Sequence, residues 1–124
     1  MGMARLYIDL HAMMEMYILD DDRNPVRCDD IGKWGEFQRD PEKRRVARSE
    51  FGQVSVSTVF LGMDHSFLGG RPLLFETMIF GGKNDGYMDR YSTWQEAESG
   101  HEAACLLVNA DAIHRDKKLG ELGI

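Results

Sequence analysis

Apolar and polar residues alternate most regularly between Gln53 and Phe80. The even-numbered positions from Val54 to Phe60 form one apolar or β-branched side, which is the period of a strand with a buried face. Residues 73–80 are apolar on both sides, as in a central strand. Residues 62–72 contain three glycines and a proline, which predicts a hairpin loop between the two strands. An antiparallel strand pair is therefore expected at the centre of the fold.

Shorter elements are predicted on both sides of this pair. Met16–Leu19 and Pro25–Cys28 are rich in β-formers and flank an Asp-rich turn, so they are expected to form a hairpin. Asp29 or Asp30 then caps a short helix, which stops before Pro41. Another short strand is expected at residues 87–91.

A longer helix is predicted near the carboxyl end. Ser92 with Gln95, or Thr93 with Glu96, matches a capping box, and the helix is expected to run to about Ile113. A stripe at steps of three and four residues should face the sheet. It comprises Trp94, Ala97, His101, Ala104 and Val108.

Together these patterns predict an α+β fold, with a mainly antiparallel sheet of about five to six strands and two helices packed on one face. The length of 124 residues suits one domain. Residues 16–113 are assigned to this single domain. Residues 1–15 are assigned to an N-terminal extension of cloning or alternative-start origin, and residues 114–124 to a frayed C-terminal tail.

Basic residues are densest in residues 42–50. If Arg44–Glu50 is a strand, Arg44 and Arg48 share one face and Arg45 lies on the other, because strand side chains alternate. Two arginines on one face suit a phosphate or a carboxylate. The favoured interpretation is a charged edge strand that discourages aggregation.

Composition indicates a folded protein, with 43% hydrophobic and 29% charged residues. The net charge of -6 argues against unaided binding of nucleic acid. Cys28 and Cys105 match no disulfide framework or metal spacing, so both are expected to be free thiols in a reducing compartment. Because the chain shows neither a membrane-length apolar run nor a secretory signal pattern, a cytoplasmic location without membrane association is expected.

Two ionisable residues fall among apolar ones. Glu76 is the one charge within residues 73–80, and the favoured explanation is an ion pair with an arginine or histidine across the sheet. His101 lies in the apolar helical stripe, where a hydrogen-bonded core histidine is the favoured interpretation. An alternative site combines both with Asp64 and His65 as general acid and base. No metal or other cofactor is expected, because the spacing does not match a zinc helix.

Three runs, Ser57–His65, Pro72–Gly81 and Asp89–His101, resemble a family of small, mostly uncharacterised proteins encoded by bacteriophages and prophages. The resemblance covers about Met16 to Val108. It implies a bacterial host cell, in which small accessory proteins bind and block a host factor or sequester a defence signal. It brings no established activity, cofactor or catalytic set, so no site residue follows from it.

Two main hypotheses result. The first is an accessory binding protein, a homo-oligomer, that inhibits a host defence protein or captures a nucleotide-like signal through residues that stack on a base and hold phosphates. These residues are Arg45, Arg48, Phe67, Arg71, Tyr87, Arg90 and Tyr91. The second is a small hydrolase or nuclease, with or without a divalent metal, that requires Asp64, His65, Glu76 and His101 to converge in one pocket. A structural or regulatory phage protein that acts within an assembly is a third possibility.

Overall fold

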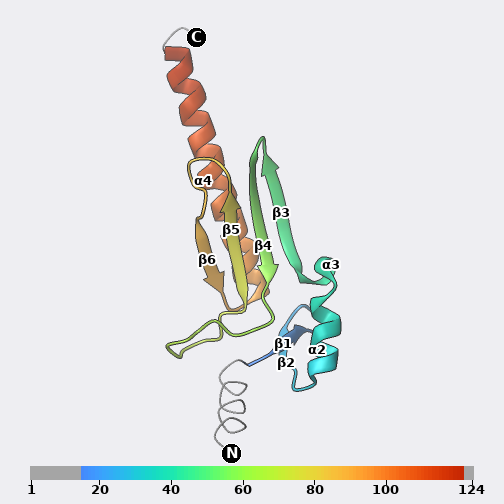
Figure 1. Ribbon diagram of the computed structural model, residues 1–124. Helices are drawn as coiled ribbons and strands as arrows, with labels where there is room; N and C mark the ends of the chain where they lie inside the picture. Colours follow the sequence, from blue (N-terminus) through green and yellow to red (C-terminus); the bar gives the residue numbers. More distant parts are fainter. Residues whose placement is uncertain (1–14, 122–124) are drawn as a thin grey trace, which may run out of the picture.

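The computed structural model describes residues 15–121 (Figure 1). The extension expected at the amino end lies outside the described residues except for Glu15. Two short strands and two short helices come first, followed by four strands and a long helix. Their bounds are β1 Tyr17–Leu19, β2 Pro25–Arg27, α2 Ile31–Gln38, α3 Pro41–Arg44, β3 Arg45–Phe51, β4 Val54–Phe60, β5 Phe75–Phe80, β6 Met88–Tyr91 and α4 Trp94–Glu121.

The main sheet has four antiparallel strands in the order β3-β4-β5-β6. Val56 stands opposite Ile79 and Thr58 opposite Thr77, so the even-numbered residues of β4 and the odd-numbered residues of β5 share the buried face. The predicted α+β class is confirmed, and so is the alternation in β4. The main sheet has four strands rather than the five or six expected.

The predicted hairpin near the amino end forms a second, two-stranded sheet of β1 and β2. Each strand has three residues. An isolated bridge between Met16 and Met63, and a hydrogen bond from the Tyr17 amide to the Gly62 carbonyl oxygen (2.9 Å), connect it to the chain that follows β4. The hairpin thus bonds to residues 62 and 63 rather than to an edge strand, and it does not extend the main sheet.

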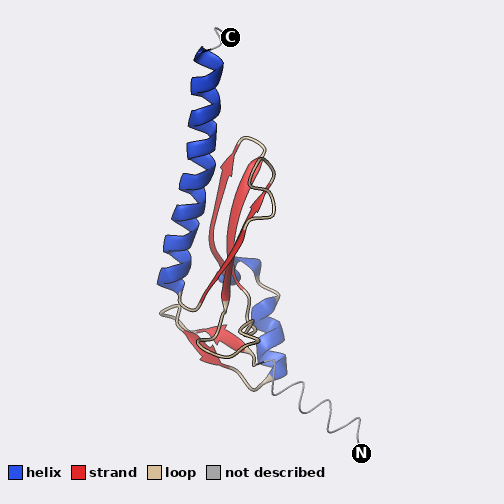
Figure 2. Ribbon diagram, turned by 90° about the vertical axis from the view of Figure 1, so that its left-hand side faces the viewer, coloured by secondary structure: helices blue, strands red, loops and turns tan. Residues whose placement is uncertain are grey.

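Helix α4 covers one face of the main sheet (Figure 2). Its inward stripe is buried as predicted and comprises Trp94, Ala97, His101, Ala104 and Val108. Gly100 lies so close to the ring of Tyr91 that a side chain there would overlap it. The helix continues to Glu121 rather than ending near Ile113, so the expected tail is helical up to that residue. Among the described residues, no helix is both long enough and apolar enough to cross a membrane.

Helix α2 lies below the sheet rather than over its face beside α4 (Figure 1). Asp30 caps it by accepting from the Lys33 amide, as predicted. The Trp34 indole donates to the Gly62 carbonyl oxygen, and the Gln38 amide donates to that of Leu61, both at 2.9 Å. These carbonyls belong to the chain leaving β4. The expectation of two helices on one face therefore does not hold for α2.

Strand β3 is an edge strand, as its charges indicated. Arg44 lies outside it, at the end of α3, and its Nε donates to the Phe60 carbonyl oxygen at 3.2 Å. A bulge between Arg45 and Ala47 then shifts the alternation of side chains. The expected pairing of Arg44 with Arg48 on one strand face is therefore wrong.

Candidate binding site

The loop of residues 62–73, which we call the tip loop, lies between β4 and β5 and is held by one carboxylate. Oδ1 of Asp64 accepts from the Ser66 amide (2.8 Å), the Ser66 hydroxyl (2.6 Å) and the Leu73 amide (3.0 Å). The His65 amide donates to the Leu73 carbonyl oxygen at 3.0 Å. Burial raises the pKa of Asp64, but hydrogen bonds from Ser66 and Leu73 outweigh burial and hold that pKa below its usual value. The two ends of the loop are thus tied together.

The side chain of His65 has a defined orientation. Its Nδ1 lies 2.8 Å from the carbonyl oxygen of Met63. Since a carbonyl oxygen only accepts, Nδ1 donates this hydrogen bond. The ring meets that of Phe67 edge to face, with centroids 6.0 Å apart.

Two large apolar side chains project from the end of the tip loop. Phe67 is 75% exposed and Leu68 is fully exposed. Gly69 and Gly70 follow with φ of 84° and 89°, in the left-handed region that favours glycine. Large apolar side chains gathered in water at one place mark an interaction surface. We call Phe67 and Leu68 the apolar tip.

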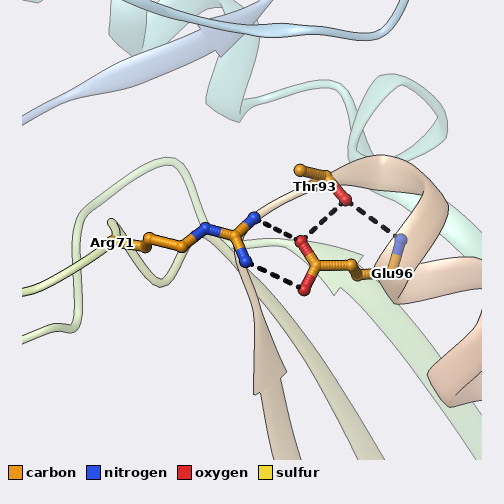
Figure 3. A network of polar contacts seen from close by, with 3 residues as sticks. All are labelled: Arg71, Thr93 and Glu96. Atoms are coloured by element: carbon orange, nitrogen blue, oxygen red, sulfur yellow. Dashed lines mark hydrogen bonds and ion pairs between the residues drawn. The ribbon is translucent and has the colours of Figure 1, made fainter.

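An ion pair joins the tip loop to the first turn of α4 (Figure 3). Nη2 of Arg71 lies 2.6 Å from Oε1 of Glu96, and Nη1 lies 3.4 Å from Oε2. The Thr93 hydroxyl donates to Oε1 (2.9 Å) and accepts from the Glu96 amide (3.1 Å), so Thr93 caps α4 as predicted. Hydrogen bonds from Arg71 and Thr93 lower the pKa of Glu96.

A pocket of about 630 Å³ lies between the tip loop, the end of β6 and the start of α4. Its volume is in the range of small-ligand sites. Four residues of the predicted binding set line it, namely Phe67, Arg71, Arg90 and Tyr91. Sequence reasoning missed Leu68 and Glu96, which also line it. The signal for Leu68 was a second apolar residue in a glycine-rich loop, whereas Glu96 was interpreted only as part of a cap.

The two arginines that line the pocket are already paired with carboxylates. Arg90 donates through Nε to Oε2 of Glu76 at 3.0 Å, so the ion pair favoured for Glu76 is confirmed. Arg71 is engaged by Glu96. Tyr91 is 9% exposed, with its ring against α4, and is therefore not free to stack on a ligand. Burial raises the pKa of Tyr91, which keeps its hydroxyl neutral.

The remaining members of the predicted binding set lie elsewhere. Arg45 pairs with Glu42 at 2.9 Å and Arg48 with Glu50 at 3.3 Å, both on the β3 side of the sheet. Tyr87 packs against the part of the core formed by β4, β5 and α4. The structure therefore splits the predicted set into a pocket group, a β3 group and Tyr87, which packs against the core.

The four residues of the hydrolase hypothesis do not converge. His101 lies between α4 and the sheet, with Nε2 2.9 Å from the Ser49 hydroxyl and Nδ1 2.8 Å from that of Thr58. Glu76 precedes the buried Thr77 in β5, so it points to the opposite face of the sheet. The carboxylate of Asp64 accepts hydrogen bonds from Ser66 and Leu73 within the tip loop. His101 is thus a hydrogen-bonded core residue, and the shared catalytic pocket that this hypothesis required is not formed.

The described residues also contain no group of three or more histidine, cysteine, aspartate and glutamate side chains placed to hold a metal ion. Comparison of the chain with protein-family models, with curated proteins and with solved structures found no match. The site must therefore be interpreted from its own geometry.

Proposed function

We propose that this protein is a phage-encoded accessory binding protein that docks onto a host protein, such as a defence factor, through the apolar tip. The observation that carries the proposal is the exposure of Phe67 and Leu68 side by side at the end of a loop. Aromatic residues, phenylalanine among them, are enriched at the centres of protein interfaces, and exposed apolar patches mark such interaction sites. The phage context rests on the sequence resemblance alone.

The surroundings of the apolar tip support a protein partner. Arg71, which is 66% exposed at its side chain, and Glu96, at 43%, flank the pocket beside the tip. An apolar centre with a polar rim is the usual anatomy of a protein interface. A partner that receives Phe67 and Leu68 would place polar groups against this rim.

A nucleotide-like ligand is the second candidate. The observation in its favour is that Phe67, Arg71 and Arg90 line one pocket of suitable size. It ranks second because both guanidinium groups already pair with carboxylates. A phosphate would have to compete with Glu96 and Glu76, and unpairing a half-buried charge costs free energy.

The test combines two substitutions at the tip with one elsewhere. Phe67→Ser with Leu68→Ser removes the apolar tip, whereas Leu106→Ser removes an equally apolar side chain, 68% exposed, from α4. Proteins captured from bacterial lysate by the wild type are identified, and the affinity of each purified candidate is measured for all three versions. We expect the tip variant to bind at least tenfold more weakly and Leu106→Ser to bind like the wild type. Equal binding by all three versions overturns the proposal.

Native mass spectrometry with a panel of cyclic and linear nucleotides tests the second candidate. A nucleotide retained at fixed stoichiometry by the wild type, and lost with Arg71→Ala, would favour ligand capture over a protein partner. Loss of the nucleotide with new product masses would indicate an enzyme.

A further inference from the structure

The face of the main sheet opposite α4 is open. Residues paired directly across neighbouring strands lie on the same face, so the register defines three rows on it. The rows are Glu50-Ser55-Phe80, Arg48-Ser57-Met78-Met88 and Arg45-Val59-Glu76-Arg90. Figure 1 looks onto this face, with α4 behind the strands. Within residues 15–121, no helix packs over these rows (Figure 2).

The rows carry an apolar patch on β5 and β6. Phe80 is 48% exposed and Met88 47%, and Met78 stands directly opposite Met88. Methionine side chains are flexible and adapt to the surface they meet, which makes them common at protein contacts. We call Met78, Phe80 and Met88 the methionine patch.

Each arginine on the open face is paired with a glutamate, one of which, Glu42, belongs to the adjacent α3. Arg48 is paired with Glu50, Arg90 with Glu76 and Arg45 with Glu42, each within 3.3 Å. The chain as a whole carries a net charge of -6. Two copies of an acidic chain repel each other over most of their surfaces, but not where each copy is neutral and apolar.

We propose that the open face binds the open face of a second copy, so that the protein is a homodimer with the methionine patches at the interface. A two-fold dimer brings the same patch of both chains together, so this patch must be self-complementary. The open face meets this requirement because each of its three arginines is paired with a glutamate of the same chain. The Arg48–Glu50 pair, 53% and 64% exposed at its side chains, can exchange partners across the two-fold axis.

The proposed dimer interface and the apolar tip are two separate surfaces of the chain. The methionine patch lies toward the β5–β6 turn, whereas the tip loop leaves the opposite end of these strands (Figure 1). Dimerisation and partner binding are therefore separable by mutation.

The test is the mass of the full chain in solution, by light scattering and native mass spectrometry, for wild type, Met88→Glu and Leu106→Glu. Both substituted residues are exposed and apolar, and only Met88 lies on the open face. We expect the wild type to have twice the mass of the 14.1 kDa chain. Met88→Glu should weaken self-association at least tenfold, because it places like charges opposite each other, while Leu106→Glu should not change it. Thermal unfolding of both variants is the control that checks that they fold.

Three outcomes overturn the proposal. They are a wild type that is monomeric at tens of micromolar, a Met88→Glu variant that dimerises like the wild type, and a dimer that Leu106→Glu disrupts equally. A monomer whose Met88 is nevertheless protected from oxidation would indicate that another part of the same chain covers the face instead.

Discussion

Nδ1 of His101 lies 2.8 Å from the hydroxyl oxygen of Thr58, in the centre of the contact between α4 and the main sheet. Burial lowers the pKa of His101, and the nearby carboxylate of Glu102 opposes this effect without cancelling it. The imidazole is therefore neutral in the folded protein, where it bonds two hydroxyl groups.

This burial predicts a loss of stability in mild acid. The unfolded chain protonates His101 near pH 6.5, its ordinary pKa, whereas the folded chain does so only at lower pH. The unfolded state then binds more protons, so this contribution to stability is complete above pH 6.5 and falls as the pH drops below it. We expect the Tm to fall between pH 7.5 and 5.5, and to fall less in His101→Gln. A wild-type slope equal to that of the variant would contradict this prediction.

Gly100 provides a test of packing. In most helices Gly→Ala is stabilising by up to about 1 kcal/mol, but a methyl group at Gly100 overlaps the ring of Tyr91. Gly100→Ala should therefore destabilise the protein by about 1–3 kcal/mol. Gly35 of α2 has no neighbour within 4 Å of an added methyl group, so Gly35→Ala is the matched control and should be neutral or stabilising. Denaturant unfolding of the two variants measures both effects.

Asp64 should control the order of the tip loop. Asp64→Ala removes the acceptor for the amides of Ser66 and Leu73, and hydrogen bonds to a charged group contribute about 1.5–3 kcal/mol each. We expect faster amide hydrogen exchange at both residues and weaker partner binding. Asp89→Ala is the control, because the exposed Asp89 carboxylate accepts from the adjacent Arg90 amide, which lies outside the tip loop. Unchanged exchange at Ser66 and Leu73 would rule out this role for Asp64.

The Glu76–Arg90 ion pair should be the strongest on the open face. Its side chains are 14% and 28% exposed, whereas those of Glu42 and Arg45 are 75% and 43% exposed. A double-mutant cycle with Glu76→Gln and Arg90→Met should give a coupling energy above 1 kcal/mol, because the half-buried charges are poorly screened. The same cycle at Glu42 and Arg45 should give about 0.2–1 kcal/mol. Equal coupling in the two cycles would contradict the prediction.

Local patterns predicted the elements of this fold better than their assembly. The alternation of β4, the cap at Asp30 and the buried stripe of α4 follow from spacings within one segment. Whether the first hairpin joins the main sheet depends on the Met16–Met63 bridge, between residues far apart in sequence. The bulge at Arg45 likewise depends on pairing with β4, which the charges of β3 do not encode.

The sequence indicated which residue types line the pocket, but not how they are arranged in space. Three of the residues predicted to bind a ligand, Phe67, Arg71 and Arg90, line the pocket. The Arg71–Glu96 ion pair joins residues 25 positions apart, so no local signal revealed that Arg71 is already engaged. The side of the sheet that Glu76 occupies was also hidden, because β5 is apolar on both faces.

The hydroxyl groups around His101 also determine where α4 rests. The stripe from Trp94 to Val108 repeats every three or four residues, so a helix displaced by one turn would still lay apolar side chains on the sheet. Such a displacement would break both hydrogen bonds of the buried His101, and a buried polar group left unpaired costs about 1–3 kcal/mol. Apolar contacts alone would allow the helix to shift by one turn, whereas the two hydrogen bonds of His101 fit a single alignment.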